Sequence, residues 1–312
     1  SEEVALVLDM MDKEKSADFA HELLQLILKN GEIKAANKLF LPMVAYLGDN
    51  RVVEAMKNYC TKKNNVLSAN LLSNNTSLYA ARALDAIMLH FKVKYPNVRE
   101  AASESFGKIA NEMGVSSLEL QDKMIPDFGF ENLFKTLEVD GKEYRVFINA
   151  DLKLAYLDDL DNIKKSLPSK ASKELKEEIK VLNKEIRTIA KQQKLSLEHN
   201  FICERKWEVA DWQKHFMTKP LMFALAQSLI WGIYEKGMLK SIFGLNEDQT
   251  LEDAKLEEIT LPKNTQIGMV HPIELNQEQL TVWQDYIKEN KLNQPFDQMS
   301  RPIYLPDEVH RF

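Results

Sequence analysis

The sequence has 312 residues, of which 45% are hydrophobic and 28% charged, with a net charge of −6 and a pI near 5.7. This is the composition of an ordinary soluble globular protein, and the length fits one large domain or two to three smaller ones. The acidic balance argues against bulk nucleic-acid binding but leaves room for a local basic face. With ten glycines and ten prolines, the chain favours helices over the many turns of an all-β fold.

Two cysteines, Cys60 and Cys203, stand in unrelated contexts, so we expect no disulfide framework and a reducing, cytoplasmic compartment. Residues 1–30 lack a signal-peptide pattern, and no apolar run reaches the roughly 18 residues of a membrane span. The first residue is Ser rather than Met, which suggests an excised fragment. We expect no metal and no cofactor, since the glycine-rich phosphate loops and the common hydrolase and zinc-protease motifs are missing.

Residues 1–130 have the pattern of paired amphipathic helices joined by short polar turns. Apolar residues at helical spacing predict helices over 17–30, 33–47, from Arg51 onward, 77–91 and 98–113. The segments LGDNRVVEAM and PNVREAASESFGKIA resemble HEAT-type repeats. Such an array stacks helix pairs and usually offers its concave surface to a partner. A short helix capped by Ser116 or Ser117 follows it.

Residues 131–168 change to a period of two. Apolar positions alternate on both sides of Asp140-Gly141, a strong hairpin signal, and alternate again from Leu152 to Tyr156. We therefore predict a small antiparallel sheet that acts as a connector.

Residues 169–206 predict one long helix, capped by Ser172 and running from Lys173 to about Lys206. One side is an apolar stripe and the others are charged, so the helix is a coiled-coil-like arm or a strut between lobes. A third interpretation is a binding stripe for an acidic partner. Interspersed glutamates favour a plain solvated face over that third interpretation. The basic residues are Lys173, Lys176, Lys180, Lys184, Arg187, Lys191 and Lys194.

Residues 207–312 predict a Trp-rich α+β lobe. We expect a short helix over Asp211–Met217 and a central, almost wholly apolar helix from Pro220 to Tyr234. The segments LKSIFGL and QIGMVHP have the pattern of strands. Asn276 is placed to cap a last helix, with Gln279 at its capping-box position.

The order of motifs in this lobe resembles a bacterial family, the domain-of-unknown-function 4132 family, represented by MolR-like proteins and often found beside WGR domains. The motifs are R-x-W, W-x-x-x-F-x-x-x-P, I-G-M-V-H-P and Q-P-F-x-Q-x-S-R-P-x-Y, and the resemblance covers roughly Ala80 to Phe312. It implies no reaction. It also implies that the family pattern continues past Arg311-Phe312, so we expect C-terminal sequence to be missing. The matching positions are Arg205, Trp207, Trp212, Phe216, Pro220, Leu229, Trp231, Phe243, Gly268, His271, Pro272, Trp283, Gln294, Pro295, Phe296, Gln298, Arg301, Pro302 and Tyr304.

The best polar cluster comprises His271, Gln294, Gln298 and Arg301. Three of them precede prolines, so rigid turns place their side chains. Arg301 would present a planar fork to a carboxylate or phosphate, and His271 would act as acid or base. The competing and favoured interpretation is that these side chains satisfy buried backbone groups.

Two weaker candidates complete the list. His199 and Cys203 lie four apart, a metal half-site without a second pair, so simple packing is favoured. The tryptophans, including Trp207 and Trp283, form either a stacking platform for bases or, as we favour, part of the core.

The sequence predicts a mainly α protein: a HEAT-like αα-hairpin array, a small sheet, a long helix and an α+β lobe. Its leading functional hypothesis is an interaction scaffold of a bacterial cytoplasmic protein that docks a protein partner. The alternatives are a nucleotide- or phosphate-binding enzyme module using His271, Gln294 and Arg301, or a nucleic-acid binder using the lysines of 173–194.

Overall fold

The computed structural model describes residues 11–29, 31, 33–91 and 93–302 and divides the chain into two compact units, Ser1–Pro126 and Asp127–Phe312. The predicted segments 131–168, 169–206 and 207–312 all lie in the second unit. Asn30, the last residue of the first predicted helix, falls outside the described residues, as do Tyr304 of the family motifs and the terminal Arg311 and Phe312.

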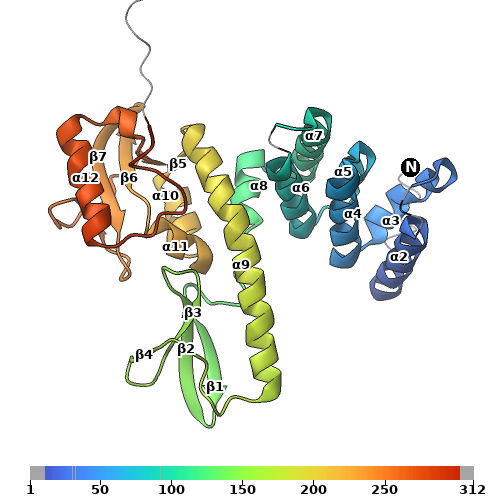
Figure 1. Ribbon diagram of the computed structural model, residues 1–312, viewed down its shortest axis with the longest axis horizontal. Helices are drawn as coiled ribbons and strands as arrows, with labels where there is room; N and C mark the ends of the chain where they lie inside the picture. The colour runs from blue at the N-terminus through green and yellow to red at the C-terminus, as the bar shows by residue number, and fades with distance from the viewer. Residues whose placement is uncertain (1–10, 30, 32, 92, 303–312) are drawn as a thin grey trace, which may run out of the picture. The chain divides into compact units, whose positions relative to one another are not determined.

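The first unit is built of helices that pack on their neighbours in the chain (Figure 1). Helix α2 packs on α3 and α4, α4 on α5 and α6, and α7 on α5, α6 and α8. The helices are α2 Lys13–Leu28, α3 Leu41–Leu47, α4 Asn50–Lys63, α5 Val66–Leu71, α6 Leu78–His90, α7 Pro96–Glu112 and α8 Ser117–Lys123, with 3₁₀ turns at Ala35–Leu39 and Leu72–Asn74. The helical character predicted for this region is confirmed.

Side-chain caps begin several of these helices. The side chains of Asp12, Asp49, Ser77 and Ser116 each accept a hydrogen bond from a backbone N–H of the first turn. Ser116 also forms a full capping box with Glu119. These bonds satisfy donors that no helical carbonyl can reach, which is why the polar turns fix where the helices start.

The prediction of one helix over 33–47 is wrong. A 3₁₀ turn, Ala35–Leu39, precedes α3, which starts at Leu41. Pro42 has no N–H to donate, and its ring would clash with the preceding turn of a continuous helix, so it is tolerated only in the first turn.

The second unit starts with a four-stranded antiparallel meander, β1 Lys135–Val139, β2 Lys142–Ile148, β3 Leu154–Leu157 and β4 Ile163–Lys164. Asp140 and Gly141 form the first turn at φ 57° and 71°, as a two-residue hairpin requires. Cross-strand pairs place Val146 opposite Tyr156 and Ile148 opposite Leu154, so these four buried side chains share one face of the sheet. The predicted antiparallel sheet is confirmed, with one strand more than expected.

Helix α9, Lys173–Ile202, runs past this sheet (Figure 1). The Ser172 hydroxyl caps it by accepting from the Leu175 N–H at 3.1 Å, as predicted. It ends before Lys206, because Glu204 turns into the left-handed region at φ 52° and Lys206–Glu208 becomes strand β5.

The C-terminal lobe holds a five-stranded antiparallel sheet in the order β5-β9-β6-β7-β8. The strands after β5 are β6 Trp231–Glu235, β7 Met238–Leu245, β8 Leu251–Glu252 and β9 Gln266–Met269. The helical elements are α10 Val209–Trp212, a π-turn Gln213–Met217, α11 Pro220–Ala226, a 3₁₀ turn Pro272–Glu274 and α12 Gln277–Glu289. The predicted Asn276–Gln279 capping box is present on α12.

The predicted single helix Pro220–Tyr234 is wrong beyond Ala226. Its second half is β6, the central strand, which pairs with β7 on one side and β9 on the other. Residues Trp231 to Tyr234 are buried on both faces of the sheet, so their sequence is a continuous apolar run. Such a run has no periodicity that would distinguish a buried strand from a buried helix.

Aromatic rings form the core on one face of this sheet. Trp231 is fully buried, and its ring centroid lies 5.3 Å from Trp212 and 4.7 Å from Phe216. Its indole N–H donates to the Ala226 carbonyl at 3.0 Å, which ties the end of α11 to the strand. On the other face, Trp283 and Tyr286 of α12 pack on Ile230 and Val270. Within the described ranges, no helix combines the length and the apolar content needed to cross a membrane.

Gly232 of β6 has no room for a side chain. An added Cβ would lie 2.5 Å from Leu239 Cδ1 and 2.9 Å from both Tyr234 Cε2 and Val270 Cγ2. We expect Gly232→Ala to lower the free energy of unfolding of the second unit by about 1–3 kcal/mol through overpacking. Urea unfolding followed by tryptophan fluorescence measures this, because all four tryptophans belong to that unit.

Gly107→Ala in α7 is the control. An added Cβ there meets no heavy atom within 4 Å, and alanine is the better helix former, so this change should stabilise the first unit by about 0.5–1 kcal/mol. Circular dichroism measures it. A Gly232→Ala protein as stable as the parent would contradict the packing described for β6.

Candidate functional site

His271 lies at the end of β9 and caps the following 3₁₀ turn. Its Nδ1 accepts from the Ile273 N–H at 3.2 Å, so the neutral ring carries its proton on Nε2. Its imidazole stacks on Phe201 of α9, with ring centroids 4.9 Å apart and planes 16° apart. Its pKa is lowered, first by burial and then by the Arg301 charge, while Glu274 and Glu204 act in the opposite direction.

Gln298 is fully buried and holds two strands together. Its Oε1 accepts from the Ile230 N–H at 3.0 Å, while its Nε2 donates to the carbonyls of Ile230 and Val270 at 2.8 and 3.0 Å. Gln294 donates to the Ser228 carbonyl and to Gln298 Oε1, both at 3.1 Å. Both amides therefore satisfy backbone groups, the interpretation that the sequence favoured.

Arg301 lies near His271 but is engaged with α9. Its Nη2 donates to Glu198 Oε1 at 2.9 Å, and its guanidinium carbon lies 5.6 Å from the Phe201 ring centroid. Phe296 also packs on Phe201, at 5.2 Å. The structure thus brings His271 and Arg301 together on one phenylalanine, whereas the two glutamines point to the strand backbone.

The two tryptophans proposed as binding residues are core residues. Trp207 and Trp283 are each 4% exposed and belong to different clusters, Trp207 with Phe216 and Trp231, and Trp283 with Tyr286. A shared stacking platform is therefore not formed by these rings.

His199, Cys203 and Cys60 are the remaining candidates for metal or thiol chemistry, and their surroundings support neither. Cys203 Sγ lies 3.7 Å from His199 Nε2, and the pair is exposed on the last turn of α9. In the part of the chain that the structure describes, no three His, Cys, Asp or Glu side chains gather as a metal site would require. Burial raises the pKa of the Cys60 thiol to about 11, which keeps it protonated and unreactive.

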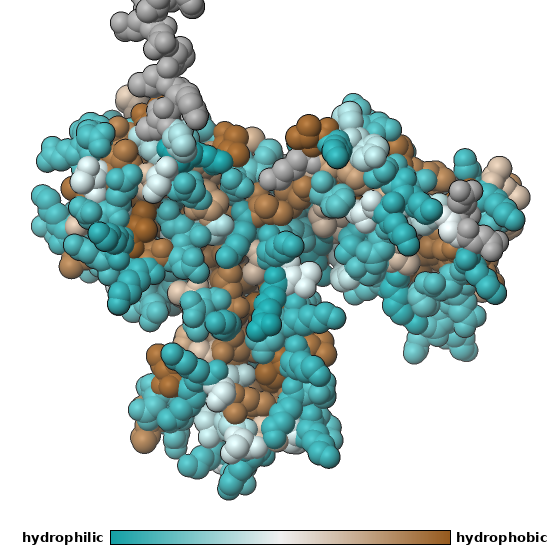
Figure 2. Space-filling view, viewed as in Figure 1, coloured by the Kyte–Doolittle hydropathy of each residue, from teal (hydrophilic) through white to brown (hydrophobic). Residues whose placement is uncertain are grey.

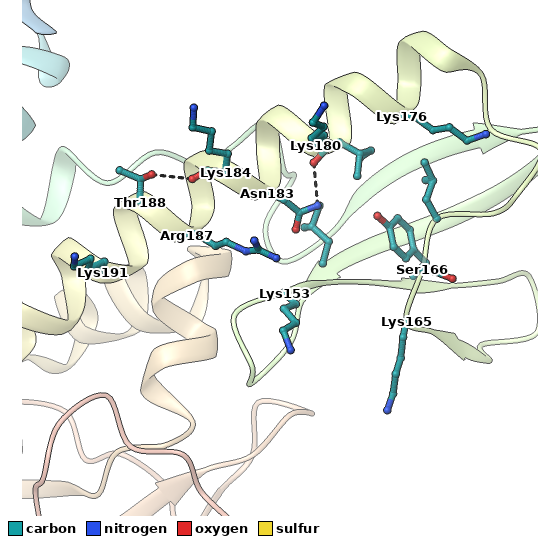
Figure 3. A pocket seen from close by; sticks show the side chains of 14 residues that line it. Lys153, Lys165, Ser166, Lys176, Lys180, Asn183, Lys184, Arg187, Thr188 and Lys191 are labelled. Carbon is teal, nitrogen blue, oxygen red and sulfur yellow. Dashed lines mark hydrogen bonds between the residues drawn. The ribbon is translucent and has the colours of Figure 1, made fainter.

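A groove of about 820 Å³ lies between α9 and the first sheet and has a strongly charged lining; we call it the basic groove (Figure 3). Its described lining residues include six lysines and one arginine and no carboxylate. The lining residues are Lys153, Leu154, Tyr156, Lys165, Ser166, Leu167, Lys176, Ile179, Lys180, Asn183, Lys184, Arg187, Thr188 and Lys191.

Helical periodicity creates this concentration of charge. Lys176, Lys180, Lys184, Arg187 and Lys191 follow one another at three or four residues, so they share one side of α9. The glutamates of α9 that alternate with them in the sequence are absent from the lining. Glutamates that alternate with the cations along the chain therefore lie elsewhere on the surface of α9. Figure 2 shows hydrophilic side chains over α9 and the first sheet, with apolar ones visible between them.

Most of these cations form no ion pair with a carboxylate of the described residues. Lys180 pairs with Glu177 at 3.2 Å, and Lys153 lies 3.9 Å from Asp151. The other five cations form no ion pair with any carboxylate of the described residues: Lys165, Lys176, Lys184, Arg187 and Lys191. Figure 3 shows Arg187 and Asn183 reaching from α9 into the space beside the strands. Such a groove concentrates positive potential and attracts an anion.

The sequence missed the sheet side of this groove. Lys153, Tyr156 and Lys165 come from the strands and loops before α9, and the packing of the sheet on the helix brings them to it. One side of the groove could be predicted from the sequence, because the lysines and the arginine of α9 recur at helical spacing. The interspersed glutamates favoured a solvated face instead.

Gln298→Leu tests the structural role of the buried amide. It keeps the volume but leaves the Ile230 N–H and the Val270 carbonyl without partners, while the Ile230 carbonyl retains the Val270 N–H, so we expect the free energy of unfolding to fall by about 3 kcal/mol. Gln284→Leu, which removes one half-buried bond to the Met299 carbonyl, should cost about 1 kcal/mol. If both variants lost the same free energy of unfolding in urea, the Gln298 amide would contribute no more to stability than an ordinary half-buried hydrogen bond.

The pKa of His271 can be followed by NMR titration. We expect it below the usual 6.5, since burial and Arg301 disfavour the imidazolium. Arg301→Gln removes a positive charge and should raise this pKa, whereas Glu274→Gln removes a negative charge and should lower it. Shifts in the reverse directions would contradict the described surroundings of the ring.

Comparison with known proteins finds similarities to an uncharacterized protein and, in the second half of the chain, to a family model. The uncharacterized protein YehI of Escherichia coli (strain K12) is 27% identical over 239 residues, which is 71% of this chain and 20% of that protein. The chain thus spans about a fifth of the length of this relative. No solved structure matches. Residues 162–311 match the family described as "Domain of unknown function (DUF4132)", so the resemblance stated from the sequence motifs is confirmed for this segment.

Proposed function

We propose that this chain is a non-catalytic interaction module whose second unit binds a polyanionic partner in the basic groove. The observation that carries this proposal is the set of seven cations around one concavity whose described lining holds no carboxylate. Five of them lack a carboxylate partner among the described residues, so an incoming anion would replace solvent and counterions rather than an internal ion pair.

The first unit is proposed to be the scaffold. Its consecutive packed helices support a HEAT-like array, and Phe19, Leu26 and Phe40 are at least half exposed on its described surface. An array of this kind suits a protein partner. A bacterial cytoplasmic setting and a MolR-like, WGR-associated context belong to the same proposal.

An enzyme module using His271, Gln294 and Arg301 has less support. Gln294 bonds to a backbone carbonyl and to Gln298, and Nη2 of Arg301 pairs with Glu198, so most of their polar atoms already have protein partners. Nη1 of Arg301 is buried without a hydrogen-bond partner among the described residues, but the two glutamines are held by backbone carbonyls.

Removing three cations tests the proposal. We expect the triple variant Lys184→Gln, Arg187→Gln, Lys191→Gln to bind fluorescein-labelled heparin more weakly than the parent protein. The slope of log affinity against log salt should become shallower by about 2, since each lost contact contributes roughly 0.7. Fluorescence anisotropy across a salt series measures both quantities.

The control is Lys62→Gln, Lys63→Gln, Lys108→Gln, which removes the same charge from exposed positions on α4 and α7. It should bind like the parent. Equal weakening of both triple variants would mean that net charge and not the groove determines binding, and the proposal would be wrong.

A further inference from the structure

Tyr156 supplies a second observation at the basic groove. It is only 3% exposed, and it lines the groove from β3, on the sheet face that it shares with Leu154. Its hydroxyl forms no hydrogen bond with any described residue. Burial raises its pKa, so the group remains a neutral O–H donor.

The Tyr156 hydroxyl is not among the buried atoms that lack a hydrogen-bond partner, so it is open to solvent in the groove although the rest of the side chain is buried. Lysine and arginine side chains carry donors alone, so the cations of the lining cannot accept the phenol proton. A ligand that displaces solvent from the groove can supply the acceptor. An anionic oxygen is the acceptor that both the phenol and the cations favour.

The cations are also arranged in a line. Lys176 to Lys191 span 15 residues of α9, or about 22 Å, with one cation per turn. A row of this kind matches a ligand that carries one negative charge per short repeat, as a phosphodiester strand does.

Apolar side chains lie between the cations. Leu154, Leu167 and Ile179 line the same concavity, with Asn183 and Ser166 as neutral polar groups beside them. We call these apolar side chains the apolar floor of the groove. A nucleobase has an apolar face that can pack on this floor and polar edges that can bond to the neutral polar groups, whereas the carboxylates of an acidic peptide would make no contact with it. A duplex keeps its bases stacked inside and would touch the row with one backbone only.

We propose that the basic groove binds single-stranded nucleic acid. Backbone phosphates lie along the cationic row of α9, one phosphate oxygen accepts the hydrogen bond from Tyr156, and bases rest on the apolar floor. This inference rests on the proposed polyanion binding and names its ligand.

The test uses the whole chain and a fluorescein-labelled oligothymidylate, with a labelled duplex of the same length and polyglutamate as competitors. We expect the single strand to bind more tightly than the duplex. Binding should weaken steeply with salt, by roughly 0.7 in slope for each phosphate contacted. Polyglutamate at equal charge concentration should compete poorly.

Tyr156→Phe keeps the ring and removes the donor. We expect about a tenfold loss of affinity for the oligothymidylate with an unchanged salt slope, because one charge-assisted hydrogen bond is lost and no cation is. Tyr144→Phe on β2 is the control, since Tyr144 lies outside the groove lining, and it should bind like the parent.

The outcomes separate the two proposals. If heparin binding depends on Lys184, Arg187 and Lys191 but the duplex or polyglutamate binds as tightly as the single strand, the nucleic-acid inference is overturned and the polyanion proposal stands. An unchanged affinity in Tyr156→Phe also overturns the inference. If neither heparin nor the oligothymidylate binds at low salt, both proposals fall.

Discussion

One amphipathic helix, α9, is the constraint on which the second unit depends. Its buried stripe includes Ile179, Leu182 and Ile186 in the first half and Leu197 and Phe201 near the end. The first half forms one wall of the groove beside the small sheet, and Phe201 receives His271, Phe296 and Arg301 from the C-terminal lobe. Burial of one stripe leaves the opposite faces for charge, so the packing that holds the unit together also exposes the cationic row.

Polar groups in the C-terminal lobe act mainly as internal connections. The Gln298 amide completes hydrogen bonds at the ends of β6 and β9, where the ladder between them stops. Glu274 accepts from both the His271 N–H and the Tyr234 hydroxyl, at 2.9 and 2.8 Å. Short segments rich in proline and glutamine thus substitute for the backbone pairing that a longer strand would supply. This explains how motifs can be idiosyncratic without being catalytic.

Local chemistry in the sequence predicted the local structure well. Ser172 and Asn276 cap the expected helices, and Asp140-Gly141 forms the expected hairpin, because each depends on a few neighbouring residues. The predicted helix from Pro220 to Tyr234 is wrong beyond Ala226, because full burial removes the periodicity that distinguishes a strand from a helix. The basic groove was not predicted for another reason. Tyr156 and α9 come together only in the tertiary fold, and no spacing in the sequence indicates that they are close.

Helix α9 also has a thermodynamic consequence. A ligand held between α9 and β3 would contact two elements that unfolding separates, so it would bind the native state and not the unfolded chain. Occupancy would then raise the melting temperature of the whole Asp127–Phe312 unit, including the tryptophan core on the other sheet. A thermal unfolding curve followed by tryptophan fluorescence would therefore report ligand binding in a groove whose lining contains no tryptophan.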